Sequence, residues 1–395
     1  MIDREESIGL MEPLTISSEA DNYSRLMDLV VEVTAASTGL ARSLPGGIAE
    51  ALSELVRAMN CYYSNFIEGH NTHPIDIEKA LKNDFSQDIK KRDLQLEAKA
   101  HIETQRWIDA GGIRGRNNTA EAITAIHEQF AKSLPEDFLW VEDPDTKEKI
   151  KVVPGEFRQR DVKVGQHYAI SPGAVRRFLK RYEEVYARLG KAETILNVAA
   201  AHHRLLWIHP FLDGNGRVAR LLSYSSLLET LETNSLWSIA RGLARNVSEY
   251  RRHLMACDDS RRGDYDGRGN LSREALCAFT EFFLTACLDQ IKFMEGLIQP
   301  GQLKGRILFW AREEIREGRL PERSEAVLQE ILLHGELPRG EVEGLLGTSG
   351  RSARRVVSAL VERKVVSSDS TRSPLRLVIP ADVTDRWLPL SLIHI

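Results

Sequence analysis

Apolar side chains recur along most of the chain at the spacing of an amphipathic helix. From Ile48 to Phe66 they fall three or four residues apart, and Gly69 follows as a residue type that commonly ends a helix. The same spacing predicts further helices before residue 300, at 89–110, 119–133, 173–189, 193–208, 218–231, 245–257 and 271–296. The pattern therefore predicts a mainly α-helical fold.

Two short stretches interrupt the helical pattern. Residues 139–153 hold β-favouring pieces on both sides of a Pro-Asp turn at 144–145, which is a hairpin signal. Residues 161–170 form a second extended stretch, with Gly165 inside it. Small β elements inserted in a helical bundle are usually local additions to the fold, but they can also serve as a lip over a site.

The pattern changes again near residue 299. After a helix at 303–316, helices are expected at 324–334, 339–346 and 349–363, and strands at 365–366 and 375–379. Three helices followed by a β-ribbon are typical of a winged helix. The sequence thus predicts three regions: an N-terminal helical region at 1–110, a helical core with the β flap at 111–298, and a linker helix with a winged-helix domain at 299–395.

Composition narrows the protein class. Hydrophobic residues make up 42% of the 395 residues, which suffices for a sizeable core and argues against a disordered chain. With 53 Lys and Arg against 57 Asp and Glu, the net charge of −4 does not suggest wholesale binding to nucleic acid or membrane. The 4 cysteines form no C-x-x-C pair, and neither a secretory signal nor a membrane-spanning run is expected. We expect a soluble, cytoplasmic protein.

The segment from His209 to Arg220 collects groups that suit phosphate chemistry. Pro210 prevents simple continuation of the preceding helix, and Gly214 and Gly216 let the backbone approach a ligand closely. A second helix is expected to start near residue 215. A glycine-rich turn that leads into a helix N-terminus offers free N–H groups and the positive end of the helix dipole, which together form an anion site.

The charged residues of this segment extend the same interpretation. Arg217 and Arg220 are three residues apart, so both guanidinium groups can reach one polyphosphate. Asp213 is a hard oxygen ligand of the kind that holds Mg²⁺ against phosphates. His209 is the local group that can be a neutral base near pH 7. The pattern indicates a metal-assisted phosphate site with a base.

His209–Arg220 resembles the signature H-P-F-x-[D/E]-G-N-G-R-x-x-R of the Fic family at every fixed position. The likeness covers about residues 62–284, and it includes 155–158, 162–165 and Pro172. The resemblance implies a Fic-type helical bundle with a β-hairpin flap. It also implies Mg²⁺-dependent transfer of AMP from ATP to a protein hydroxyl.

The resemblance assigns a role to each polar residue of the signature. His209 would deprotonate a Ser, Thr or Tyr hydroxyl, which then attacks the α-phosphate. The other residues would bind the nucleotide and its metal: Asp213 the Mg²⁺, Gly214, Asn215 and Gly216 the anion hole, Arg217 the β-phosphate region and Arg220 the γ-phosphate. Phe211 would be a buried anchor of the loop.

An inhibitory element is expected upstream. Ser64–Gly69 resembles the motif [S/T]-x-x-x-E-[G/N], which in the family blocks the site. Glu68 falls on the last turn of its helix, where the helix dipole disfavours an acid. By resemblance, Glu68 pairs with Arg220 and occupies the guanidinium that the γ-phosphate needs, while Ser64 braces Glu68 one turn earlier. An ordinary surface glutamate beside a helix-ending glycine is the alternative.

The partners follow from this assignment. The extended stretch, with Val162, Lys163, Val164, Gly165, Gln166 and His167, is expected to dock a target segment through its backbone. The expected partners are ATP and a protein with a free hydroxyl, including this chain itself. A homodimer is left open.

Two other functions remain open. The same residues, with Glu68 orienting a water molecule, would remove AMP from a modified protein. Alternatively, Arg351, Arg354 and Arg355 on the third C-terminal helix would contact DNA in a regulator with a repurposed core. DNA binding is not favoured, because the other helices of that region are acidic.

Overall fold

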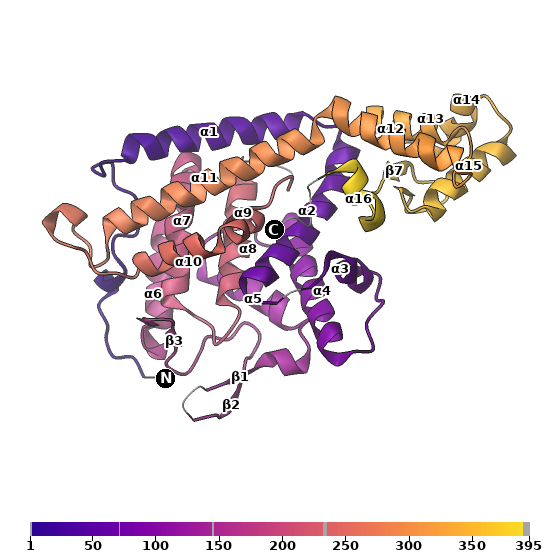
Figure 1. Ribbon diagram of the computed structural model, residues 1–395. Helices are drawn as coiled ribbons and strands as arrows, with labels where there is room; N and C mark the ends of the chain where they lie inside the picture. The colour runs from indigo at the N-terminus through magenta and orange to yellow at the C-terminus, as the bar shows by residue number, and fades with distance from the viewer. Residues whose placement is uncertain (1, 71, 144–145, 232–234, 390–395) are drawn as a thin grey trace. The chain divides into compact units, whose positions relative to one another are not determined.

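The computed structural model describes residues 2–70, 72–143, 146–231 and 235–389, and it confirms a mainly α-helical protein (Figure 1). The chain divides into two compact units. Residues 1–35, 57–232 and 238–290 form the larger unit, and residues 36–56, 233–237 and 291–395 form the smaller one.

The larger unit is built around two helices that are buried along most of their length, α7 (Lys191–Ile208) and α8 (Asn215–Leu231), which lie side by side (Figure 1). Small and branched apolar residues, such as Ala199, Ala200 and Leu222, let the two helices pack closely. The surrounding helices are α3 (Pro74–Leu81), α4 (Ile89–Asp109), α5 (Ala120–Ala131), α6 (Val175–Tyr186), α9 (Ile239–Arg245) and α10 (Val247–Ala256).

Three longer helices contribute residues to both units: α1 (Tyr23–Arg42), α2 (Gly46–Ile67) and α11 (Arg273–Ile298). The apolar spacing predicted α2 and α11 to within a few residues. It did not predict α1, α3 or α9. Since α3 and α9 are only 8 and 7 residues long, they span about two turns each and show little periodicity.

Both interruptions of the helical pattern are antiparallel hairpins. In the first, β1 (Trp140–Glu142) pairs with β2 (Lys149–Lys151), while the expected Pro-Asp turn at 144–145 lies outside the described residues. In the second, β3 (Lys163–Val164) pairs with β4 (His167–Tyr168) through a turn at Gly165 and Gln166. Gly165 has a φ of 61°, a left-handed conformation that glycine adopts without strain.

The smaller unit contains the expected C-terminal helices and strands. Its helices are α12 (Pro300–Arg316), α13 (Ser324–His334), α14 (Val342–Leu346) and α15 (Gly350–Glu362). The expected strands are β6 (Val366–Ser367) and β7 (Leu375–Leu377), and β5 (Glu336–Leu337) adds a third, in the order β5-β7-β6. A last helix, α16 (Ala381–Trp387), was not predicted, and its Trp387 packs edge-on against Trp310 of α12.

Within the described residues, every helix is too short or too polar to cross a bilayer.

Candidate active site

The turn between α7 and α8 is held in a fixed shape by its own residues. His209 ends α7 in a left-handed conformation, with φ 51° and ψ 63°, which non-glycine residues seldom adopt. Gly214 is also left-handed, and its carbonyl accepts the first hydrogen bond of α8, from Val218 N at 3.0 Å. Asn215 Oδ1 accepts from Phe211 N at 3.0 Å, and Asn215 Nδ2 donates to Phe211 O at 2.8 Å. The Asn215 side chain therefore braces the turn, and its expected place in the lining of the anion hole stays a prediction.

The turn rests on a buried pair of aromatic rings. Phe211 is fully buried, as expected, and stacks on the imidazole of His127 with centroids 3.8 Å apart. Nδ1 of His127 accepts a hydrogen bond from Gly155 N at 2.9 Å. Burial lowers the pKa of His127 to about 4, so this ring is neutral near pH 7 and can act as an acceptor. His127 thus links α5 to both the turn and the segment that leads into the second hairpin.

A buried arginine joins the second hairpin to the same turn. Arg158 is only 1% exposed, and its guanidinium donates to the carbonyls of His209 at 2.7 Å, of Arg160 at 2.8 Å and of Ile170. Its backbone N–H donates to Pro210 O at 2.9 Å. Burial lowers the pKa of Arg158 to about 10, which leaves it charged at neutral pH. Arg158 therefore fixes the two ends of the hairpin segment relative to His209.

His209 has the protonation state of a base. Burial lowers its pKa to about 4, so the imidazole is neutral near pH 7. Its Nδ1 lies 3.3 Å from the carbonyl oxygen of Leu206. Because a carbonyl can only accept, this contact favours the tautomer with the proton on Nδ1. Nε2 then carries the free lone pair.

Arg220 is held by Ser64 and Glu68 at the end of α2. Its guanidinium, only 4% exposed at the side chain, donates from Nε to Ser64 Oγ at 2.9 Å and pairs with the carboxylate of Glu68. This is the pairing expected from the sequence. Burial alone would raise the pKa of Glu68, but the attraction of Arg220 and then Arg217 outweighs it and lowers the pKa. Glu68 is therefore ionised at neutral pH.

The Glu68 carboxylate lies at the start of α8. A Cβ on Gly216 would collide with Oε1 of Glu68, so the carboxylate covers the first turn of this helix. The same position carries the positive end of the α8 dipole. An anion of the protein itself thus occupies the place where the sequence predicts a bound phosphate.

Arg217 has acidic partners on two sides. Its Nη2 lies 2.9 Å from Oε1 of Glu97, which is fully buried on α4, and its Nη1 lies 3.7 Å from Oδ2 of Asp213. The guanidinium also lies over the ring of Phe130, 5.2 Å from the centroid. The second oxygen of Glu97 is 2.7 Å from Nδ1 of His70, and this hydrogen bond raises the pKa of His70.

Asp213 is the residue expected to hold a metal. Its side chain is 51% exposed on the turn. The described residues contain no group of three or more His, Cys, Asp and Glu side chains that would hold a metal alone. A single exposed carboxylate suits Mg²⁺ that takes its other ligands from phosphates and water.

Some side chains of the second hairpin are exposed to solvent, and one contacts α7. Val164 and Tyr168 are exposed, whereas Nε2 of His167 lies 2.8 Å from the carbonyl oxygen of Trp207, near the end of α7. Val162 O accepts from Ala169 N at 3.2 Å. His167 therefore anchors the hairpin beside His209, while the tip remains open to solvent.

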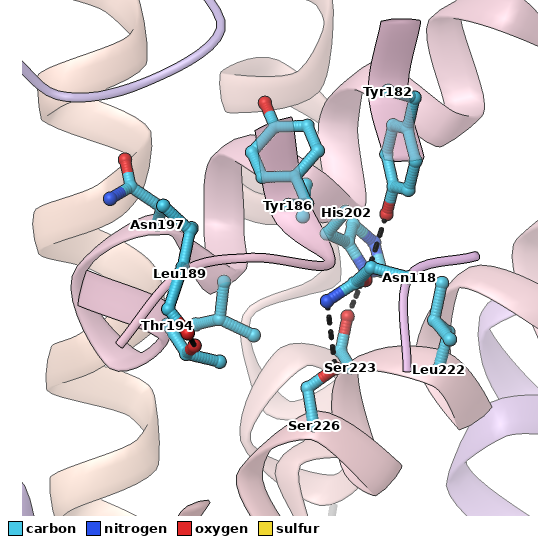
Figure 2. A pocket seen from close by; sticks show the side chains of 12 residues that line it. Asn118, Tyr182, Tyr186, Leu189, Thr194, Asn197, His202, Leu222, Ser223 and Ser226 are labelled. Carbon is cyan, nitrogen blue, oxygen red and sulfur yellow. Dashed lines mark hydrogen bonds between the residues drawn. The ribbon is translucent and has the colours of Figure 1, made fainter. Parts of the chain in front are cut away.

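A small internal pocket is lined by residues of α6, α7 and α8. The Tyr182 hydroxyl donates to Asn118 Oδ1 at 3.0 Å, and Asn118 Nδ2 donates to Ser226 Oγ at 3.3 Å (Figure 2). His202 contacts Ser223 at 2.9 Å from the same pocket. The free volume of about 10 Å³ has room for one water molecule, so this pocket is too small for a nucleotide.

Glu97 and His127 were not singled out from the sequence, and the sequence assigned no role of their own to His70 and Arg158. Glu97 and His101 fall within the apolar phase of α4, and both are buried. The sequence could have indicated Glu97, because a polar residue at a position of the helix that faces the core needs a partner inside the protein.

Residues 117–227 match the model of the Fic/DOC family. The protein adenylyltransferase Fic of Drosophila willistoni is 29% identical over 218 residues, which cover 52% of this chain and 41% of the fly protein. The chain therefore spans less than half the length of this curated relative.

Solved structures give the same fold. The crystal structure of a Fic family protein from Desulfovibrio desulfuricans G20 has a TM-score of 0.51 at 16% identity, covering 93% of this chain and 99% of that one. A Fic domain containing signaling protein from Bacteroides thetaiotaomicron VPI-5482 also has a TM-score of 0.51, at 19% identity, covering 67% of this chain and 95% of that one. At these identities the likeness concerns the fold alone.

Proposed function

We propose that this chain, which carries a Fic domain at residues 117–227, transfers AMP from ATP to a hydroxyl group of a protein. One observation carries the proposal: a neutral histidine and two buried arginines converge on the glycine turn at the N-terminus of α8. The relation to a protein adenylyltransferase supports the same reaction. Transfer from a nucleotide depends chiefly on positioning and charge neutralisation, which this arrangement supplies.

The nucleotide would bind with its phosphates over the first turn of α8. The backbone N–H groups of the Gly214–Gly216 turn would contact the phosphate oxygens, and Arg217 and Arg220 would bind the β- and γ-phosphates. Asp213 would hold Mg²⁺, which supplies further neutralisation of the phosphate charge. The Asn215 side chain would keep the turn in shape through its bonds with Phe211.

His209 would act as the general base. Nε2 would take the proton of a Ser, Thr or Tyr hydroxyl, and the hydroxyl oxygen would attack the α-phosphorus. The bond between the α-phosphorus and the oxygen that bridges to the β-phosphorus then breaks. Diphosphate leaves, and Arg217 and Arg220 would neutralise its negative charge. The β3–β4 hairpin beside His209 would hold the target segment by strand addition.

Glu68 would inhibit this reaction. Its carboxylate covers the first turn of α8 and neutralises Arg220, so a phosphate and Glu68 compete for the same place. One guanidinium cannot serve both anions in a bidentate geometry. ATP would then bind with its γ-phosphate displaced and its α-phosphate misaligned.

The test compares two radioactive labels. The Glu68→Gly variant is incubated with Mg²⁺ and either α-labelled or γ-labelled ATP, and label on protein is measured. AMP transfer predicts label from α-labelled ATP only. Label from γ-labelled ATP, as in a phosphorylation, would reject the proposal.

Removal of AMP is a second candidate, favoured by the charge of Glu68. An ionised carboxylate can orient a water molecule by accepting its hydrogen bond, and Glu68 is 32% exposed beside the proposed phosphate site. An AMP-modified protein incubated with the wild-type chain would then lose its label faster than with Glu68→Gly. Equal loss with both proteins would exclude this role.

A further inference from the structure

One buried carboxylate connects the inhibitory segment to the phosphate-binding arginines. Glu97 is fully buried on α4 and has two partners from distant parts of the chain. Its Oε2 is 2.7 Å from Nδ1 of His70, and its Oε1 is 2.9 Å from Nη2 of Arg217. A carboxylate without exposure depends on such partners, since an unpaired buried charge is strongly unfavourable.

His70 and Glu68 both belong to the segment 65–70 that ends α2, here called the cap. After α2, Gly69 is left-handed with a φ of 87°, His70 N donates to Asn65 O at 2.9 Å, and Gly69 N donates to Phe66 O at 3.0 Å. These two bonds form the Schellman arrangement, which fixes the chain direction at a helix end. The backbone of Glu68 and His70 is therefore held in one fixed geometry.

We propose that the contact between His70 and Glu97 is a second tether that keeps Glu68 on Arg220. The inference rests on the proposed transfer of AMP. A phosphate can occupy the first turn of α8 only after Glu68 has left, and the contact of His70 with Glu97 holds the helix end that carries Glu68 close to Arg220. His70 is thus a positioning residue of the inhibitory carboxylate.

The tether also couples the two arginines. Glu97 serves both His70 and Arg217, so the inhibitory cap is bound to each arginine of the proposed phosphate site: to Arg220 through Glu68 and to Arg217 through His70 and Glu97. A polyphosphate on Arg217 and Arg220 therefore has to compete with both carboxylates, Glu97 and Glu68, for the two guanidinium groups.

The test is a double-mutant cycle. The initial rate of labelling from α-labelled ATP is measured for the wild type, His70→Ala, Glu68→Gly and the double variant. His70→Ala is expected to raise the wild-type rate about 3- to 10-fold, because it removes one charge-assisted hydrogen bond of the cap. In the Glu68→Gly background, the same change is expected to have no effect.

Two variants serve as controls. His73 lies in the same loop, is exposed, and makes no capping hydrogen bond, so His73→Ala should match the wild type. His70→Gln keeps an N–H donor for Glu97 and should restore much of the inhibition. A purely structural role of His70 would instead lower the rate in both backgrounds, and this result, or an unchanged rate in His70→Ala, overturns the tether.

A measurement without catalysis separates this inference from the proposed function. Hydrogen exchange of the backbone amides in residues 64–70 is followed without nucleotide. His70→Ala should speed exchange in this segment relative to His73→Ala. If Glu68→Gly shows no labelling but exchange is faster, the proposed function fails and the tether stands. If exchange is unchanged, the tether is wrong whatever the activity.

Discussion

His209 can serve as a general base only while its imidazole is neutral. Its burial between the end of α7 and the second hairpin secures this state, because burial lowers its pKa to about 4. We predict that His209→Ala in the Glu68→Gly background reduces labelling by about 10²- to 10⁴-fold, the usual loss for a positioned base. ATP binding, measured by calorimetry, should be retained. Labelling close to that of the parent variant would refute the assignment.

The same pKa predicts the dependence of the rate on pH. A histidine with a lowered pKa is deprotonated above that value, so the base form is present throughout the neutral range. The kcat/KM of Glu68→Gly should therefore stay nearly constant between about pH 6 and pH 8 and fall only as the pH approaches 4. Circular dichroism over the same range checks folding. A fall centred on the ordinary histidine value of 6.5 would contradict the burial argument.

Asp213 gives a prediction about the metal. It is an exposed carboxylate at the turn, and Mg²⁺ needs such a ligand together with phosphate oxygens. Asp213→Ala should lose most labelling, and EDTA should silence Glu68→Gly. Excess Mg²⁺ should restore the EDTA-treated protein but not Asp213→Ala. Undiminished labelling in EDTA would exclude the metal.

Among the helices and strands, the sequence predicted most of those with long regular patterns, although it missed the 20-residue helix α1. The 18 residues of α7 and the 17 of α8 lie on either side of a turn whose Pro and Gly residues are visible in the sequence, so the candidate site could be located. Glu97 and His127 could not be assigned in this way. Their partners lie far away in the sequence, and only packing brings them together.

For Asn215, the sequence does not predict the orientation of the side chain. Its residue type suits an anion hole as well as a bracing role, and the sequence contains no information on which way the side chain turns. Its two bonds with Phe211 depend on the backbone conformation of the turn. A contact of the Glu68 side chain was easier to predict, because an acid at the C-terminal end of a helix indicates a cationic partner elsewhere.

The β3–β4 hairpin allows a sharp test of target docking. In its register, Val164 faces His167 and Lys163 faces Tyr168, and Ala169 N donates to Val162 O. Antiparallel pairs alternate, so Val164 uses its N–H within the hairpin and Lys163 directs its N–H to the open edge. Lys163→Pro should therefore impair modification of a target protein more than Lys163→Ala. Equal effects of the two changes would argue against docking by the backbone.

The chain as a whole has an acidic balance, and its smaller unit carries exposed arginines on α15. Arg351, Arg354 and Arg355 are exposed there, while the net charge of the chain is −4. We predict little affinity of the full chain for duplex DNA, measured by fluorescence anisotropy at low and at physiological salt. A tight complex that weakens with salt and with triple alanine replacement would reveal a phosphate-contacting face instead.

The measurement that tests the proposal most directly is the rate of AMP labelling by wild type and Glu68→Gly, with Arg220→Ala as the third protein. Removing the carboxylate should open the first turn of α8 and raise the rate by up to about 10²-fold, since a misplacement of about 1 Å costs that much. Arg220→Ala should stay slow, because it frees Glu68 but loses the γ-phosphate contact. An unchanged or lower rate in a folded Glu68→Gly protein would contradict inhibition by Glu68.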